Sequence, residues 1–282
     1  MRLDQRKKCV PHRTQRGFTL VEMIVVIVIT GILGGMIAMF ISGPVQGYVD
    51  SARRAEMTDI ADTALRRITR DVRMALPNSV RITAAGAAYY LEFIPTSGGG
   101  RYRAEVDPAM PASDKLDFTA ADTAFDVLGT MPAFAAGDSV VVNNLGTVGA
   151  SAYEVPPTNR ASWVSNTSTT VMIAAMLFPA SSPKNRFQVI ATPVTYVCSP
   201  AAGGAGGTLT RYWGYATQAV QPNNVNAAPL SGASHALLAS NVSACNFANV
   251  AARPGLVTVY LTMAESGESI SLYDAAYVAN VP

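Results

Sequence analysis

Glu22 is the residue whose type and position most call for a chemical explanation, because it stands inside an apolar run. Residues 23–41 contain no charged side chain, and the four residues before Glu22 are uncharged as well. An ionised carboxylate held in a hydrocarbon environment costs roughly 2–3 kcal/mol and calls for a cationic partner. The alternative is that Glu22 lies at a membrane interface and is solvated there. Its position alone leaves both interpretations open.

The segment before this run, residues 1–17, is strongly basic. It holds six basic residues against the single acid Asp4 and so carries +5, which leaves −3 of the chain's total of +2 for the remainder. Basic residues that precede an apolar run direct the N-terminus to the cytoplasm and the following body across the membrane. Because the body itself has no basic excess, we expect it to bind no nucleic acid.

The apolar run is long enough to cross a bilayer. As a helix, residues 18–41 would span about 36 Å at ~1.5 Å per residue, against a hydrocarbon core of ~30 Å. A buried core helix would be shorter and would have a polar face. No clean small-x-small cleavage site follows Ile41, so we expect the helix to be retained as an anchor.

The residues that join the basic segment to the run carry a specific resemblance. Residues 16–22 read RGFTLVE, and this stretch resembles the processing site of type IV prepilins and type II secretion pseudopilins. In that family a membrane-embedded peptidase cuts after the glycine and methylates the new N-terminal residue. The resemblance therefore implies cleavage between Gly17 and Phe18, N-methylation of Phe18 and an assembly role for Glu22.

Cleavage at this position would create a free amine on Phe18. In a packed filament that amine would lie in an apolar core, and Glu22 of a neighbouring subunit is its natural partner. A buried ion pair that loses one member costs ~3–5 kcal/mol, so the pair would act mainly as a register device. Hydrophobic packing of the helices would provide most of the attraction.

The resemblance also implies partners and a subtype. We expect a prepilin peptidase/N-methyltransferase, other minor pilins and the major pilin, an inner-membrane assembly platform and the lipid bilayer as partners. The 240 residues after residue 42 suit a minor pilin or minor pseudopilin that primes assembly. Residues 75–82, 211–215 and 278–282 resemble a large minor pilin of mannose-sensitive haemagglutinin (MSHA) pilus biogenesis. A J-type minor pseudopilin that contacts exported cargo, and a single-pass membrane enzyme or receptor, are the alternatives.

A second helical segment follows the run. Gly43-Pro44 predicts a kink or a short melted stretch, and apolar residues then recur every three or four positions over residues 45–76. Its arginine-rich face is either solvated or in contact with a neighbouring subunit. We therefore expect a leader at 1–17, a transmembrane assembly helix at 18–42, an amphipathic helix at 43–77 and a β-rich body at 78–282.

The body reads as β-structure, which predicts an α+β, pilin-like fold with a long N-terminal helix packed on antiparallel sheets. Turn-rich stretches at residues 97–100 and 200–207 separate candidate strands, and residues 264–267 predict the turn of a final hairpin. The expected strands are residues 79–83, 89–94, 101–106, 115–118, 124–128, 139–143, 170–174, 186–191, 194–198, 208–215, 242–247, 255–263 and 269–278.

The remaining reactive residues indicate structure more than catalysis. Cys9 belongs to the leader, so Cys198 and Cys245 form an even pair in an exported body and predict a disulfide, with two free buried thiols as the alternative. His235 reads as a neutral surface residue in a loop. Aspartates between residues 107 and 138 lack the D-x-D-x-D-G calcium pattern. We expect no catalytic residue, no metal and no cofactor.

Overall fold

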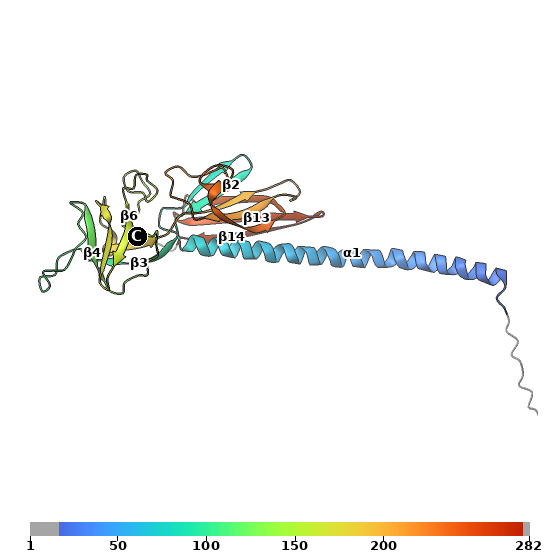
Figure 1. Ribbon diagram of the computed structural model, residues 1–282. Coiled ribbons are helices and arrows are strands. Elements are labelled where there is room, and N and C mark those ends of the chain that lie inside the picture. Colours follow the sequence, from blue (N-terminus) through green and yellow to red (C-terminus); the bar gives the residue numbers. More distant parts are fainter. Residues whose placement is uncertain (1–16, 279–282) are drawn as a thin grey trace, which may run out of the picture. The chain divides into compact units, whose positions relative to one another are not determined.

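The computed structural model describes residues 17–278, so most of the expected leader, including Cys9, lies outside the described residues. The chain forms two compact units, Met1–Ala52 and Arg53–Pro282. One long helix, α1, runs from Leu20 to Arg73 (Figure 1). Each unit is described by itself below.

Helix α1 is continuous through Gly43-Pro44. The expected melted stretch at this position is therefore not observed. Proline lacks one backbone N–H and so removes a single hydrogen bond, and the turns on either side keep the helical path. The helix ends at Arg73, four residues before the expected end at residue 77, because the next residues pair with a strand. The N–H of Leu76 donates to the carbonyl of Ile94 at 2.7 Å, and the Met74 carbonyl accepts from Thr96 at 2.8 Å.

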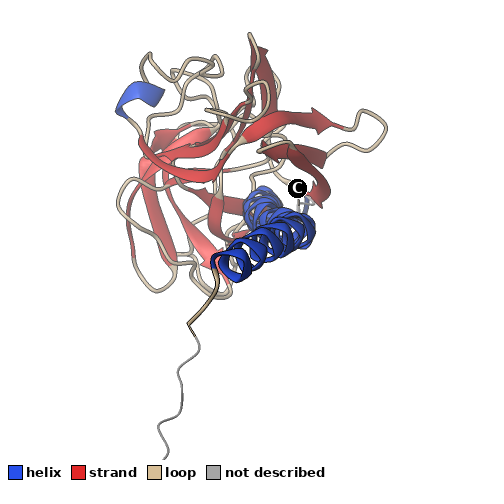
Figure 2. Cartoon of the chain, turned by 90° about the vertical axis from the view of Figure 1, so that its right-hand side faces the viewer, coloured by secondary structure: helices blue, strands red, loops and turns tan. Residues whose placement is uncertain are grey.

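The C-terminal part of α1 packs its apolar face on two antiparallel sheets (Figures 1 and 2). The five-stranded sheet has the order β1 (Arg81–Ala85), β2 (Ala88–Phe93), β9 (Val194–Ser199), β10 (Thr208–Trp213) and β11 (Ser234–Ser240). The three-stranded sheet consists of β12 (Val242–Asn249), β13 (Leu256–Glu265) and β14 (Glu268–Tyr277). The expected α+β, pilin-like architecture is thus confirmed.

One hydrophobic core joins the helix and both sheets. Ile68 and Val72 of α1, Tyr196 of β9 and Leu261 of β13 are all at most 1% exposed and belong to the same cluster. In β13, Val257, Val259, Leu261 and Met263 face this core while the intervening residues face outward. The final hairpin turns at Ser266-Gly267, both with positive φ, as the sequence predicts.

A closed six-stranded barrel is inserted between β2 and β9. It contains β3 (Thr96–Tyr102), β4 (Asp122–Leu128), β5 (Ser139–Val141), β6 (Arg160–Asn166), β7 (Thr170–Met176) and β8 (Arg186–Ile190), in the order β3-β4-β7-β6-β5-β8. The barrel has its own core, built around Tyr102, Phe125 and Phe187. Two short 3₁₀ turns, Pro183–Asn185 and Leu230–Gly232, lie in connections. The strand pattern of the sequence did not predict a closed barrel.

Several strand predictions in and near the barrel are wrong. Residues 97–100, expected to form a turn, belong to β3. Glycine is needed there because a Cβ on Gly100 would lie 2.8 Å from the Phe187 ring. Residues 115–118 form no strand. The N–H of Leu116 instead donates a hydrogen bond to the Arg103 carbonyl at 2.9 Å. Strands β6 and β11 were not expected.

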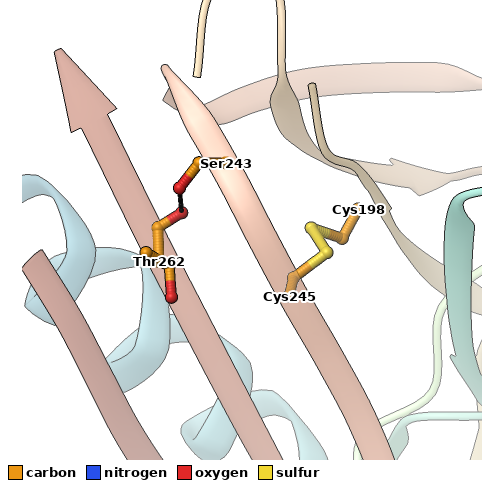
Figure 3. Close-up of a disulfide and its surroundings, with 4 residues drawn as sticks. All are labelled: Cys198, Ser243, Cys245 and Thr262. Carbon is orange, nitrogen blue, oxygen red and sulfur yellow. Dashed lines mark hydrogen bonds between the residues drawn. A yellow bond between two sulfur atoms is a disulfide. The ribbon is translucent and has the colours of Figure 1, made fainter. Parts of the chain in front are cut away.

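The disulfide joins the two sheets. Cys198 of β9 and Cys245 of β12 are bonded at 2.03 Å, both buried in the shared core (Figure 3). On the adjacent strand pair, Ser243 donates its hydroxyl to the carbonyl of Thr262 at 3.3 Å. The two cysteines paired here are those that the sequence analysis assigned to the exported body.

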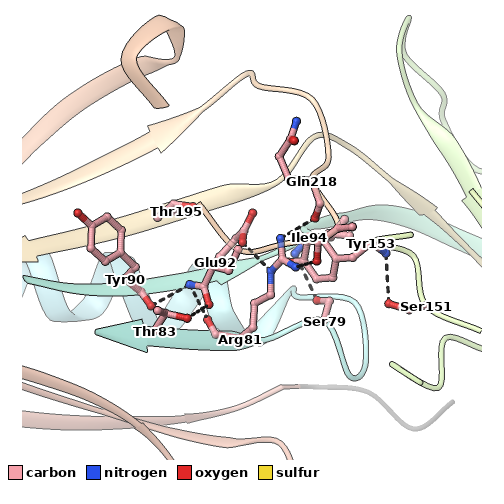
Figure 4. Close-up of polar contacts among 12 residues, drawn as sticks. Ser79, Arg81, Thr83, Tyr90, Glu92, Ile94, Ser151, Tyr153, Thr195 and Gln218 are labelled. Carbon is pink, nitrogen blue, oxygen red and sulfur yellow. Dashed lines mark hydrogen bonds and ion pairs between the residues drawn. The ribbon is translucent and has the colours of Figure 1, made fainter. Parts of the chain in front are cut away.

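A polar network connects the barrel to the five-stranded sheet. Arg81 of β1 pairs with the fully buried Glu92 of β2 at 2.7 Å, and its guanidinium also lies over the ring of Tyr153 from the barrel (Figure 4). Tyr215 donates to the other Glu92 oxygen at 3.0 Å. Burial raises the pKa of the Glu92 carboxyl, although Arg81 and Tyr215 oppose this effect.

Candidate processing and assembly site

The expected cleavage point lies immediately outside the first turn of α1. Gly17, Phe18 and Thr19 are non-helical, and the helix begins at Leu20. Thr19 is the N-cap: its hydroxyl oxygen accepts the N–H of Glu22 at 3.2 Å, and its carbonyl accepts the N–H of Met23 at 3.2 Å. This role of Thr19 was not predicted, although threonine followed three residues later by glutamate is a recognised capping pattern.

Gly17 is not required by the fold of the described chain. A Cβ built on this residue would meet no atom within 4 Å, and its φ lies outside the left-handed region that favours glycine. Phe18 is 78% exposed. The bond between the two residues therefore lies exposed in a non-helical segment, and the described residues give no steric reason for glycine at residue 17.

Glu22 lies in the first turn of α1. An acidic side chain there interacts favourably with the helix dipole. Within residues 17–278 no cation forms an ion pair with Glu22. The described part of the first unit therefore leaves the carboxylate without a cationic partner.

The surface of α1 around and beyond Glu22 is apolar and uncovered. Every residue from 17 to 49 is exposed, and this part of α1 is long and apolar enough to cross a membrane. Its hydroxyl groups bond to the helix backbone: Thr30 donates to the carbonyl of Ile27 at 3.2 Å and Ser42 to that of Met39 at 2.9 Å. Such internal bonds keep polar groups satisfied in a hydrocarbon environment.

Three glycines in this stretch are likewise open. A Cβ on Gly31, Gly34 or Gly35 would meet no atom within 4 Å, so the isolated chain does not need glycine at these positions. Small residues permit close approach of membrane helices, and glycine is also common in such helices.

Farther along, α1 is attached to the sheets through Asp71. The Asp71 carboxylate accepts from Tyr196 at 2.7 Å and from Arg211 at 3.1 Å, and pairs with Arg67 at 3.3 Å. Burial, followed by the charge of Asp71, raises the pKa of the Tyr196 hydroxyl. The two helical pairs visible in the sequence, Asp62–Arg66 and Arg67–Asp71, are both present.

The remaining candidate residues are not gathered into a reactive cluster. His235 lies in β11, not in a loop as expected, and its ring stacks on Tyr212 at 5.5 Å between centroids. In the part of the chain that the structure describes, no group of three or more His, Cys, Asp or Glu side chains could hold a metal ion. The neighbouring carboxylates Asp122 and Asp126 add to burial in raising the pKa of Asp114.

Comparison with known proteins identifies the N-terminal part of the chain. Residues 12–38 match the prokaryotic N-terminal methylation motif, which is the type IV prepilin-like motif. No curated protein and no solved structure matches the chain. The motif covers Gly17, Phe18 and Glu22 together with the first part of α1. The chain therefore combines a prepilin-like methylation motif, one apolar helix of membrane-spanning length and a pilin-like α+β body.

Proposed function

We propose that this protein is a non-catalytic minor pilin or pseudopilin that is processed by a prepilin peptidase and helps to initiate a filament. The main supporting observation is that the methylation motif contains an exposed Gly17-Phe18 bond. This bond lies directly before the N-cap of an exposed apolar helix. Cutting before the apolar stretch preserves the helix as an anchor and creates the amine that Glu22 of a neighbouring subunit needs.

In this proposal the chain is a single-pass inner-membrane protein with a cytoplasmic N-terminus and a periplasmic body. The basic residues before the run support that orientation. Residues 1–17 are the cleaved leader, 18–42 the transmembrane assembly helix, 43–77 its continuation into the body and 78–282 the globular part. The disulfide is consistent with an oxidising compartment. The mature protein can then enter a filament, including its tip.

The subtype that we favour is a minor pilin of an MSHA-like pilus, similar to the MshO protein of that system. Short sequence similarities at residues 75–82 and 211–215, and the large body, support this assignment. The similarity at residues 278–282 falls almost entirely outside the described residues. Its partners would be other minor pilins, the major pilin and the inner-membrane assembly platform.

A J-type minor pseudopilin of type II secretion is the second candidate. The observation in its favour is the inserted barrel, a separate folded module that could contact exported cargo. A membrane-anchored enzyme or receptor is the third candidate, and turnover or ligand binding by the purified protein would support it. Neighbouring genes distinguish the first two candidates. Pilus biogenesis genes would accompany a minor pilin, whereas an outer-membrane secretin operon would accompany a pseudopilin.

N-terminal sequencing of the protein isolated from cell envelopes tests the proposal. We expect the mature chain to begin with N-methylated Phe18 in cells that contain the peptidase, and to retain the leader in cells without it. A protein that begins at Met1 in peptidase-positive cells, or beyond Ile41, would disprove the proposal.

A further inference from the structure

The solvent face of α1 in the second unit carries two charged blocks of opposite sign. We call this surface the charge stripe: an acidic block of Glu56, Asp59 and Asp62, followed by a basic block of Arg66, Arg70 and Arg73. The steps of three and four residues place all six on one helix face, opposite the buried Ala61, Ile68 and Val72. Five of the six residues are exposed, and the Asp62 side chain is 45% exposed.

Most of the stripe is not neutralised within the molecule. Asp62 and Arg66, which meet at the boundary between the blocks, pair at 2.6 Å. Arg70 comes only within 4.0 Å of Asp71, whose carboxylate is already bonded to Arg211 and Tyr196. In residues 17–278 no ion pair involves Glu56, Asp59 or Arg73. Asp274 of β14 lines the same hollow as Arg66, Arg70 and Arg73 and adds to the effect of Asp62 in raising the pKa of Arg66. The structure nevertheless gives it no ion pair with any of these arginines, so two acids at one end of the stripe and two arginines at the other keep most of their charge available.

Two other arginines of α1, in contrast, form ion pairs within the molecule. Arg54 pairs with Glu268 of β14 at 3.1 Å, and Arg67 pairs with Asp71 at 3.3 Å. Intramolecular partners thus exist for the arginines that point towards the sheets. The unneutralised charges belong to the outward stripe, whose small neighbours Ala55 and Thr63 are exposed as well.

We infer that the charge stripe is a self-complementary surface that binds the stripe of a second copy, arranged parallel and shifted along the helix. The centres of the blocks, Asp59 and Arg70, are 11 residues apart, which is about 16 Å along a helix. A shift of this size brings the basic block of one copy level with the acidic block of the next. Charge complementarity on one chain is what identifies the partner as another copy.

The parallel arrangement rests on the proposed function. The same blocks would also match in an antiparallel pair centred near residue 64, but two copies anchored in one membrane with the same orientation are parallel. A parallel, shifted contact uses different surfaces on the two copies, so it does not close and can propagate. Exposed ion pairs add little affinity, but they select register and partner, while the apolar helices hold the copies together.

Cysteine cross-linking of full-length copies in the membrane tests the inference. Ala52→Cys and Thr63→Cys are also 11 residues apart and lie outside the charged positions. In cells that produce both variants together, we expect the yield of the 52–63 cross-link to be at least about tenfold above that in cells that produce only one variant. A dominant link between two copies of Thr63→Cys would reveal antiparallel pairing and overturn the inference.

Charge reversal supplies the matched controls. The base-reversed chain carries Arg70→Glu and Arg73→Glu, and the acid-reversed chain carries Glu56→Arg and Asp59→Arg. When all copies in a cell carry the same reversal, the yield of the cross-link should fall by about tenfold. Together the two reversed chains should regain it in either placement of the two cysteines, because every basic block then faces an acidic block of the other chain. An unchanged yield after reversal, or no recovery in the mixture, would overturn the inference.

N-terminal sequencing of the same samples separates the two possible failures. A mature chain that starts at Phe18 but gives no 52–63 cross-link contradicts the charge stripe alone. A chain that keeps its leader contradicts the proposed processing, and with it the reason for a parallel arrangement.

Discussion

The guanidinium carbon of Arg81 lies 3.6 Å from the centroid of the Tyr153 ring. Arg81 belongs to β1 of the five-stranded sheet, whereas Tyr153 follows β5 in the barrel. The same guanidinium pairs with buried Glu92 and donates to the carbonyls of Gln218 and Ala219 at 2.8 Å. One arginine therefore fixes the barrel, the sheet and a long loop to one another.

Replacing Tyr153 tests this attachment. Tyr153→Leu removes the ring beneath the cation, and we expect the free energy of unfolding to fall by about 1–2 kcal/mol. Tyr153→Phe keeps the ring and removes a buried hydroxyl that has no hydrogen-bond partner among the described residues, so it should be at least as stable as the wild type. Urea denaturation of the mature protein in detergent measures both changes, and a destabilised Phe variant would contradict the ring-based contact.

Glu92 should give the body a distinct pH dependence. Because burial raises the pKa of this carboxyl above its ordinary value of 4.5, the folded state holds the proton more tightly than the unfolded state. The resulting stabilisation is complete below pH 4.5 and is lost as the pH rises through the folded pKa. The unfolding free energy of the wild type and of Glu92→Gln should be measured at steps from pH 4.5 to 8. The wild type should lose stability relative to Glu92→Gln as the pH rises. A constant difference would exclude this linkage.

Gly17 should matter for processing and not for folding. Gly17→Leu should leave an uncut, membrane-retained precursor whose body still folds and forms the disulfide, since a Cβ at this residue would meet none of the described atoms within 4 Å. Gly47→Leu, at another open glycine, is the matched control and should be cut normally. Immunoblotting and N-terminal sequencing measure the outcome, and a normal Phe18 terminus in Gly17→Leu would refute the expectation.

Glu22 should matter for assembly and not for processing. Glu22→Ala and the isosteric Glu22→Gln should both be cut, yet both should reduce filament number severely, because an unpaired buried charge costs ~3–5 kcal/mol. Thr19→Ala is the control for the helix cap, because it removes the N-cap oxygen but keeps the Glu22 carboxylate. It should lower helix stability by about 1 kcal/mol. Electron microscopy counts the filaments. Normal numbers with Glu22→Gln would disprove the charge requirement.

The Cys198–Cys245 bond should contribute strongly to stability. It closes a separation of 47 residues, for which the chain-entropy estimate is about 4 kcal/mol. Replacing both cysteines by alanine should lower the unfolding free energy by about this amount, and Cys9→Ser should have no effect on the mature protein. Mass mapping under non-reducing conditions should find the linked peptides, and two free thiols in the wild type would contradict the assignment.

Strong local patterns allowed the helix and the final hairpin to be predicted from the sequence. Val257, Val259 and Leu261 alternate with polar residues because one face of β13 covers α1 while the other faces solvent. The processing residues also stand together in the sequence, and so they needed no tertiary information.

Tertiary packing explains what the sequence could not predict. Gly98-Gly99-Gly100 reads locally as a turn, yet it forms a strand because its backbone pairs with β8, and the Phe187 ring beside Gly100 leaves no space for a larger residue. The serine- and alanine-rich β11 carries no alternation to indicate its pairing with β10. Leu116 and Phe118 produce a strand-like pattern merely because they contribute to the barrel core. Arg81 also contacts Tyr153 and Gln218, which are 72 and 137 positions away in the sequence, and no local pattern encodes these contacts.

The placement of the barrel has a consequence for engineering. The chain leaves the five-stranded sheet at the end of β2 and re-enters it at the start of β9, and Phe93 is the direct ladder partner of Val194. The two attachment points are thus one strand spacing apart, about 4.8 Å. A foreign module whose own termini lie equally close can be grafted there in exchange for residues 96–190 without breaking the ladder. Such a chimera would carry an enzyme or an epitope into any fibre that accepts the subunit.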